Sequence, residues 1–173
     1  MSILDWLGGN ASSTRDGGGD TATVRRIVAE LRRLDPPKAR HLAAFAYVLS
    51  RVASADLDIS ELEMRKIVEI VQRVGNLPEE QALLVAEIAK SQNLLFGGTE
   101  NFLVTREFKE IATEAERREL LDCLFAVAAA DDAITAEEDG QVWQIASELG
   151  FSHREYIEAR LAYSSKRTVF RQQ

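Results

Sequence analysis

The chain has 173 residues, of which 46% are hydrophobic and 28% are charged, and this suits one domain with a packed core and a soluble surface. Its net charge of -7 and pI near 5.0 argue against general nucleic-acid binding, because neutralising phosphates needs a basic face. The single Cys123 excludes an intramolecular disulfide and leaves no cysteine cluster for zinc. It lies in the apolar run 120–130, which predicts a buried and inert thiol.

The first twenty residues combine a short apolar piece with a segment rich in Gly, Ser and Asp, and we expect residues 1–20 to be flexible. Residues 1–7 lack the basic region and long apolar core of a signal peptide. Their apolar side chains form one amphipathic turn that suits docking on this protein, on a partner or on a membrane surface. A frayed chain end is the other interpretation.

From Thr21 onward the pattern predicts helices almost throughout, and no strand signal is present. Asp35-Pro36-Pro37 ends the first helix, because proline cannot continue the hydrogen-bond ladder. The second helix then runs to about Ala53. The third is expected to end at Gly75, in the position of a left-handed C-terminal cap. Pro78 opens the fourth, which runs to about Ser91.

Gly97-Gly98 separates these four helices from four more. Three later helices, like the third, begin with a Ser or Thr followed three positions on by Glu, which is the capping-box pattern. These pairs are Ser60 with Glu63, Thr113 with Glu116, Thr135 with Glu138, and Ser152 with Glu155. We expect the sixth helix to reach Ala130, the seventh to stop at Gly150 and the eighth to fade near Ser164.

An internal repeat relates the two groups of helices at a constant offset of 75 residues, without gaps. The stretch 53–63 reads ASADLDISELE, and 128–138 reads AAADDAITAEE. A shared offset over more than thirty residues indicates an internal duplication. The predicted fold is therefore all-α, with about eight helices in two pseudo-symmetric four-helix halves, 21–91 and 96–164. These form one domain over 21–164, followed by a solvated tail, 165–173.

Enzymatic chemistry has little support in the sequence. Neither His41 nor His153 lies near Cys123 along the chain, and no serine stands in a nucleophile-elbow context. The glycines at 17–19 follow no strand and lack the lysine of a phosphate-binding loop. We therefore expect a protein without catalytic activity or an evident small-molecule substrate, and a divalent cation is the one possible cofactor.

The two acidic turns are the only group of residues in the sequence that suggests ligand binding or chemistry. Their candidate metal ligands are Asp56, Asp58, Glu63, Asp131, Asp132 and Glu138. Calcium takes six to eight oxygen ligands, so one turn cannot supply them, whereas two turns brought together by the pseudo-symmetry would come closer. Calcium, magnesium, manganese and zinc are the candidate cations. The competing interpretation is structural, because Glu63 and Glu138 already serve as capping-box partners and carboxylates favour helix N-termini.

The doubled pattern Ala-x-Ala-Asp-x-x-Ile-Ser/Thr-x-x-Glu resembles the signature of TerB-like domains, named for a tellurite-resistance protein. The stretch 137–150 is similar to a bacterial branch of that family, and the resemblance covers about residues 21–160. It implies an all-helical fold of seven or more helices and an acidic surface holding divalent metal, through Asp56, Glu63, Asp131 and Glu138. The family has Gly after the Asp, whereas this chain has Leu57 and Asp132.

The resemblance leaves two functions open. The first is a non-catalytic protein of a tellurite- or metal-stress response that binds divalent metal or a protein partner. The second is a helical interaction module without metal that acts near the membrane or with a chaperone system, since such domains also precede membrane-anchored DnaJ-type co-chaperones. The expected location is the cytoplasm, with peripheral contact to the inner membrane through residues 1–7 under the second function.

Overall fold

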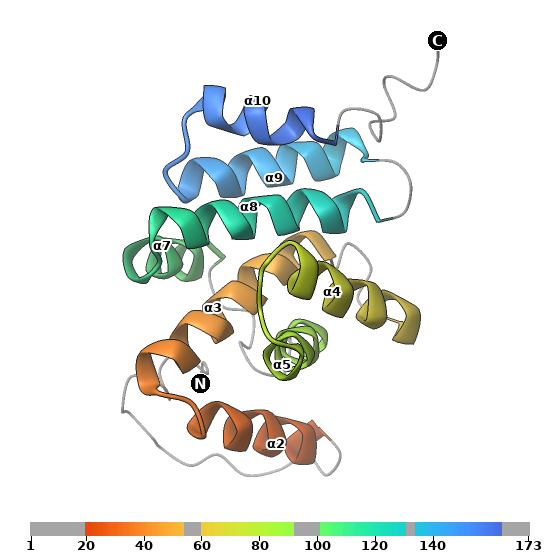
Figure 1. The fold of residues 1–173 in the computed structure, drawn as a ribbon, viewed down its shortest axis with the longest axis vertical. Helices are drawn as coiled ribbons and strands as arrows, with labels where there is room; N and C mark the ends of the chain where they lie inside the picture. The colour runs from red at the N-terminus through yellow and green to blue at the C-terminus, as the bar shows by residue number, and fades with distance from the viewer. Residues whose placement is uncertain (1–19, 54–59, 92–100, 131–133, 164–173) are drawn as a thin grey trace.

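The structure is a computed structural model that describes residues 20–53, 60–91, 101–130 and 134–163. These residues form eight α-helices and no sheet, so the predicted all-α fold is confirmed for this part of the chain (Figure 1). In chain order the helices are α2 (Asp20–Arg32), α3 (Pro36–Ala53), α4 (Glu61–Arg73), α5 (Glu79–Lys90), α7 (Asn101–Ile111), α8 (Glu114–Ala128), α9 (Ala136–Glu148) and α10 (His153–Leu161).

Four of these helices begin with the predicted capping box. The Ser or Thr side chain accepts from the backbone N–H three residues on, and the Glu carboxylate there accepts from the cap residue's own N–H. The second bond is 2.7 Å long at Ser60, Thr113 and Ser152 and 2.8 Å at Thr135. Each box satisfies N–H groups that a helix N-terminus otherwise leaves unpaired, and the loss of such a cap typically costs about 1 kcal/mol.

The helix ends follow the sequence with one exception. α2 ends at Arg32, and Pro36 opens α3, as the proline pair predicts. The left-handed conformation expected for Gly75 is wrong, because the positive φ after α4 belongs to Asn76, at 53°. Gly150, the equivalent glycine after α9, does have positive φ, at 90°. A Cβ on Gly75 would lie 2.7 Å from the Val71 carbonyl oxygen and 3.2 Å from Cys123 Sγ, so close packing requires this glycine.

The core lies around α3, which contacts α5, α7, α8 and α9 (Figure 1). Apolar and small side chains on most sides of α3 are buried, among them Leu42, Phe45 and Leu49. Facing them from α8 are Leu120, Leu124 and the buried Cys123. A helix buried on nearly every side is the expected centre of an all-α domain.

The offset of 75 holds closely at the centre of the fold. α4 at 61–73 and α9 at 136–148 have equivalent bounds, and α3 and α8 end at the equivalent Ala53 and Ala128. The outer helices do not pack equivalently, since α7 lies against α3 and α9, whereas its counterpart α2 lies against α5 and α3. The arrangement is compatible with duplication followed by divergence, and the duplication itself stays a prediction.

The two predicted terminal segments fall largely outside the described residues, which begin at Asp20 and end at Tyr163. Within the described chain, no helix is both long enough and apolar enough to cross a membrane.

Candidate functional site

Four of the six candidate metal ligands, Asp56, Asp58, Asp131 and Asp132, lie outside the described residues. The remaining two, Glu63 and Glu138, occupy equivalent positions in the first turns of α4 and α9.

Glu63 and Glu138 act as capping residues. One carboxylate oxygen of Glu63 accepts from the backbone N–H of Ser60 at 2.7 Å. Glu138 does the same with Thr135 and also accepts from the Thr135 hydroxyl, both at 2.8 Å. The Ser60 hydroxyl and then its backbone N–H lower the pKa of Glu63 below its ordinary value, because hydrogen bonds favour the ionised carboxylate. Both glutamates are thus used in local architecture through one oxygen each.

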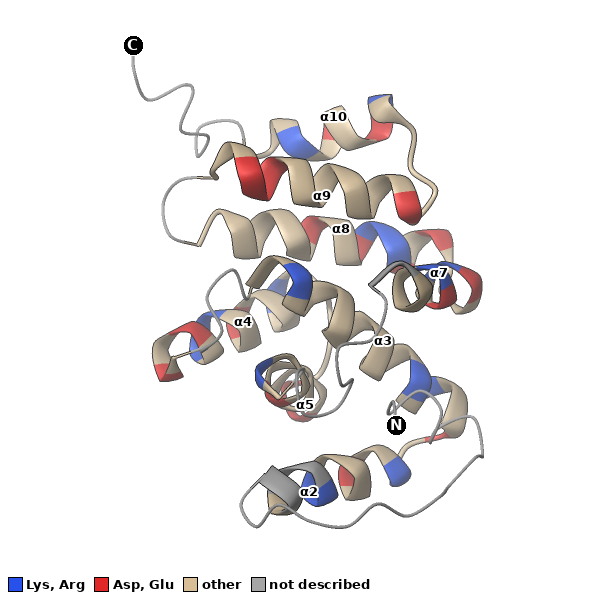
Figure 2. Cartoon of the chain, turned by 180° about the vertical axis from the view of Figure 1, so that it is seen from behind, with Lys and Arg blue, Asp and Glu red and all other residues tan. Residues whose placement is uncertain are grey.

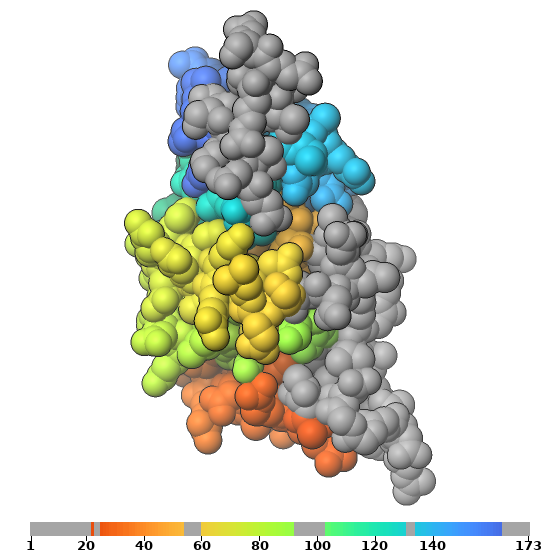
Figure 3. All heavy atoms as spheres, turned by 90° about the vertical axis from the view of Figure 1, so that its right-hand side faces the viewer, coloured from red at the N-terminus to blue at the C-terminus, as the bar shows by residue number. Residues whose placement is uncertain are grey.

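The flanks of the two acidic turns lie close together. Lys66 stands in the second turn of α4, shortly after the first acidic turn, and its ammonium donates to the carbonyl of Ala130 at 3.5 Å. Ala130 is the last described residue before the second acidic turn, and the buried Ile134 follows that turn. Figure 3 looks onto this face, where the yellow α4 lies below the teal end of α8 and the cyan start of α9. Two motifs 75 residues apart are therefore neighbours at their described ends.

The same face is acidic on α9. This helix has Glu137, Glu138 and Asp139 in its first turn and contains no Lys or Arg (Figure 2). Among the side chains that the structure describes, no group of three or more His, Cys, Asp or Glu is arranged to hold a metal ion.

Asp139 belongs to a different cluster, which the sequence did not reveal. Its carboxylate accepts from the Tyr156 hydroxyl at 2.6 Å and pairs with Arg160 at 3.4 Å, which joins α9 to α10. Burial, followed by this bond to Asp139, raises the pKa of Tyr156. The Arg160 guanidinium also lies 5.4 Å from the centre of the Tyr156 ring. Asp139 therefore has partners inside the protein.

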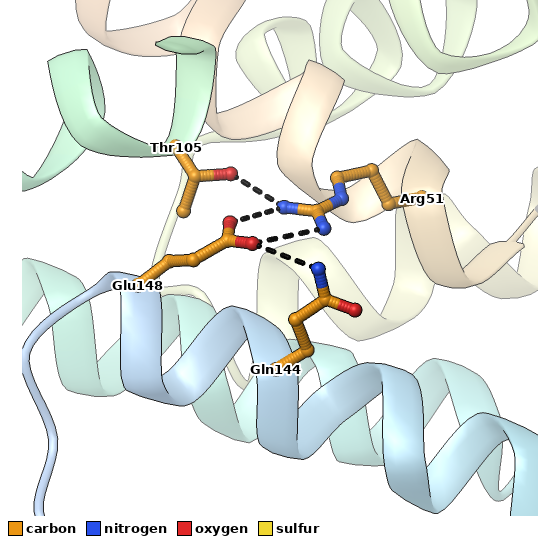
Figure 4. Close-up of polar contacts among 4 residues, drawn as sticks. All are labelled: Arg51, Thr105, Gln144 and Glu148. Atoms are coloured by element: carbon orange, nitrogen blue, oxygen red, sulfur yellow. Dashed lines mark hydrogen bonds and ion pairs between the residues drawn. The ribbon is translucent and has the colours of Figure 1, made fainter. Parts of the chain in front are cut away.

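A second polar cluster missed by the sequence joins three helices (Figure 4). Arg51 of α3 donates to Glu148 of α9 at 2.6 Å and to the hydroxyl of Thr105 of α7 at 2.7 Å. Gln144 donates to the same carboxylate at 3.2 Å. The Arg51 and Glu148 side chains are only 6% and 10% exposed. The one available signal was a charged residue between the core positions Leu49 and Val52.

The residues considered for catalysis lie in separate environments. Cys123 is fully buried, and burial raises the pKa of its thiol to about 12, which agrees with the predicted inert role. His41 is half-buried beside Phe108, and its pKa is lowered chiefly by that burial. His153 is exposed, and its ring meets the edge of Trp143 at 4.9 Å between ring centres.

The fold and the turns together define a class of protein: an all-α domain in which two capped helices, each preceded by an acidic turn, start on the same face. The family model that describes tellurite resistance protein TerB matches residues 40–161, which is more than half of the chain. The chain therefore belongs to the TerB family, as the doubled motif predicted. Comparison with curated proteins and with solved structures gave no match.

Proposed function

We propose that this TerB-family protein is a non-catalytic binder of a divalent cation in a tellurite- or metal-stress response, and that its two acidic turns provide the ligands together. The observation that carries the proposal is the contact between Lys66 and Ala130, which brings the described flanks of the two turns to one place. Asp56, Asp58, Asp131 and Asp132 are the proposed ligands. Glu63 and Glu138 remain caps that fix the helix starts next to them.

The chemistry of the residues supports this assignment. Hard cations such as calcium and magnesium bind several oxygen ligands, and aspartates from two turns supply more of them than one turn does. The caps leave the four aspartates unassigned, whereas other acids of the region, such as Asp139, are engaged in protein contacts. Lys66 lies at the flanks of the two turns, and its positive charge repels a cation bound nearby.

The test is calorimetric titration of the full chain with calcium, magnesium, manganese and zinc, one at a time. We expect heat of binding from at least one of them, and its loss when the four aspartates are changed to asparagine.

A matched control changes two exposed acids elsewhere, Glu79 and Glu80 at the start of α5, to glutamine. This variant should bind as the parent does, since its net charge changes without any change at the turns. Absence of heat at millimolar metal with every cation would sink the proposal, and so would equal binding by the four-aspartate variant.

A further inference from the structure

An open groove lies between α4 and α5. Its apolar lining comes from Met64 and Val68 of α4 and Leu83 of α5, and its volume is about 270 Å³. Leu83 is 47% exposed, which is unusual for a large apolar side chain beside two others. Glu61, Arg65 and Glu69 contribute the polar part of the lining.

This lining suits a short apolar segment with a polar side. Apolar anchors in a groove with a polar edge are the common mode by which an amphipathic turn is held. Within this chain, residues 3–7 read Ile-Leu-Asp-Trp-Leu, with apolar residues at the spacing of one helical face and one acid between them.

The described contacts place the start of α2 within reach of the groove. Arg26 of α2 pairs with Glu87 of α5 at 2.9 Å, and Glu87 lies one helical turn beyond Leu83. At 1.5 Å of rise per residue, Asp20 is roughly 9 Å along α2 from Arg26, and Leu83 is roughly 6 Å along α5 from Glu87. Even with both long side chains extended between them, Asp20 lies on the order of 30 Å or less from Leu83.

The chain between residues 3–7 and α2 is long enough to let this segment reach the groove. Twelve residues, 8–19, separate the apolar segment from α2. Fully extended they span about 40 Å, and as a Gly-rich chain they average roughly 20 Å. A tether of this kind supplies a local concentration on the order of millimolar. The chain's own segment therefore has an advantage over a dilute partner for the same groove.

We propose that the segment Ile3–Leu7 docks, within one molecule, in the groove that Met64, Val68 and Leu83 form between α4 and α5. Trp6 is the largest anchor of the segment, and its ring covers the exposed face of Leu83. This inference is independent of the proposed cation site, which lies at the turns.

The experiment uses the fluorescence of Trp6 in the full chain. The protein has two tryptophans, so Trp143→Phe provides a background in which Trp6 is the only reporter. Phenylalanine retains a ring against Tyr156, which Trp143 meets at 4.9 Å between ring centres. Quenching by acrylamide and the emission maximum report whether Trp6 is covered.

In this background we expect blue-shifted emission and quenching several-fold weaker than in the same background with Leu83→Asp. Leu161→Asp is the matched control, because Leu161 is 63% exposed on α10 and lies outside the groove lining. It should leave Trp6 covered. Leu83→Gln, a milder change, should shift the signal in the same direction as Leu83→Asp. Circular dichroism checks that each variant retains its helices.

Three results would overturn the proposal. The first is equal quenching in the background and in Leu83→Asp. The second is protection of Trp6 that disappears on dilution, which would assign the groove to a second copy of the chain. The third is a blue shift that appears only with anionic vesicles and is equal in both variants, which would assign the segment to a membrane surface.

Discussion

The last turns of α4 and α9 occupy equivalent positions, 75 residues apart, but their charges are arranged differently. Arg73 of α4 pairs with Glu69 of the same helix at 2.8 Å, and these side chains are 76% and 64% exposed. The equivalent of Arg73 is Glu148 of α9, which pairs with Arg51 of α3 and is almost fully buried. The two helices thus share equivalent bounds, while the charge that ends α4 pairs at the surface and the charge that ends α9 pairs in the interior with the other half. The local pattern specifies the helix, and the packing around it has diverged.

The comparison of the two ion pairs predicts the largest loss of stability for substitution of Glu148. Glu148→Ala leaves the Arg51 guanidinium buried, bonded to the Thr105 hydroxyl but without its carboxylate, and breaking a buried pair in this way typically costs about 3–5 kcal/mol. Glu69→Ala in the exposed pair should cost no more than about 0.5 kcal/mol. Urea unfolding followed by circular dichroism measures both.

A double variant sharpens this prediction. Replacing Arg51 and Glu148 together by methionine removes both charges, so it should be less destabilising than Glu148→Ala. Equal losses of stability from Glu148→Ala and Glu69→Ala would show that burial does not distinguish the two pairs.

The glycines that follow the same two helices give the second prediction. Gly75→Ala places a Cβ against the Val71 carbonyl, and such overpacking typically costs about 1–3 kcal/mol. Gly150→Ala forces an L-residue into a left-handed conformation, at a cost of roughly 1–2 kcal/mol.

Asparagine separates these two causes. It tolerates left-handed backbone, so Gly150→Asn should recover part of the loss seen with alanine, whereas Gly75→Asn should be worse than Gly75→Ala. Thermal unfolding of the four variants measures the pattern. Recovery by asparagine at both positions would contradict the close-packing role of Gly75.

What the sequence predicted well depends on local chemistry. The capping boxes, the proline that opens α3 and the end of α9 before Gly150 each follow from residues within a few positions of one another. Gly75 resembles Gly150 in sequence, but a Cβ there would meet the Val71 carbonyl at 2.7 Å and also Cys123 Sγ of another helix, 48 positions away, at 3.2 Å. A local pattern contains no information about such a contact.

The candidate site shows the same limit. The acids were found because their residue types repeat, whereas their use as a cation site depends on how two turns 75 residues apart are placed. The pair of Arg51 with Glu148 spans 97 residues and arises between two charged positions that look ordinary in their own helices. Family membership was accessible because the doubled motif is itself a local signal.

The smallest expected change in stability comes from the first capping box, Ser60 with Glu63, and it depends on pH. Ser60→Ala removes the hydroxyl oxygen that accepts from the backbone N–H of Glu63 and should cost about 1 kcal/mol near neutral pH. It should also raise the pKa of Glu63 toward its ordinary value, because the Ser60 hydroxyl is the largest cause of the lowered pKa. NMR titration of the Glu63 carboxyl measures the pKa, and Thr135→Ala, which affects only the other box, should leave it unchanged.

The direction of the stability change follows from linkage. The folded-state pKa of Glu63 is lowered, so its contribution is complete above the unfolded-state pKa of about 4.3 and is lost as pH falls through the folded value. The difference in unfolding free energy between the parent and Ser60→Ala should therefore shrink below that pH. A difference that stays constant down to strongly acidic pH would mean that the glutamate's charge adds nothing to the cap.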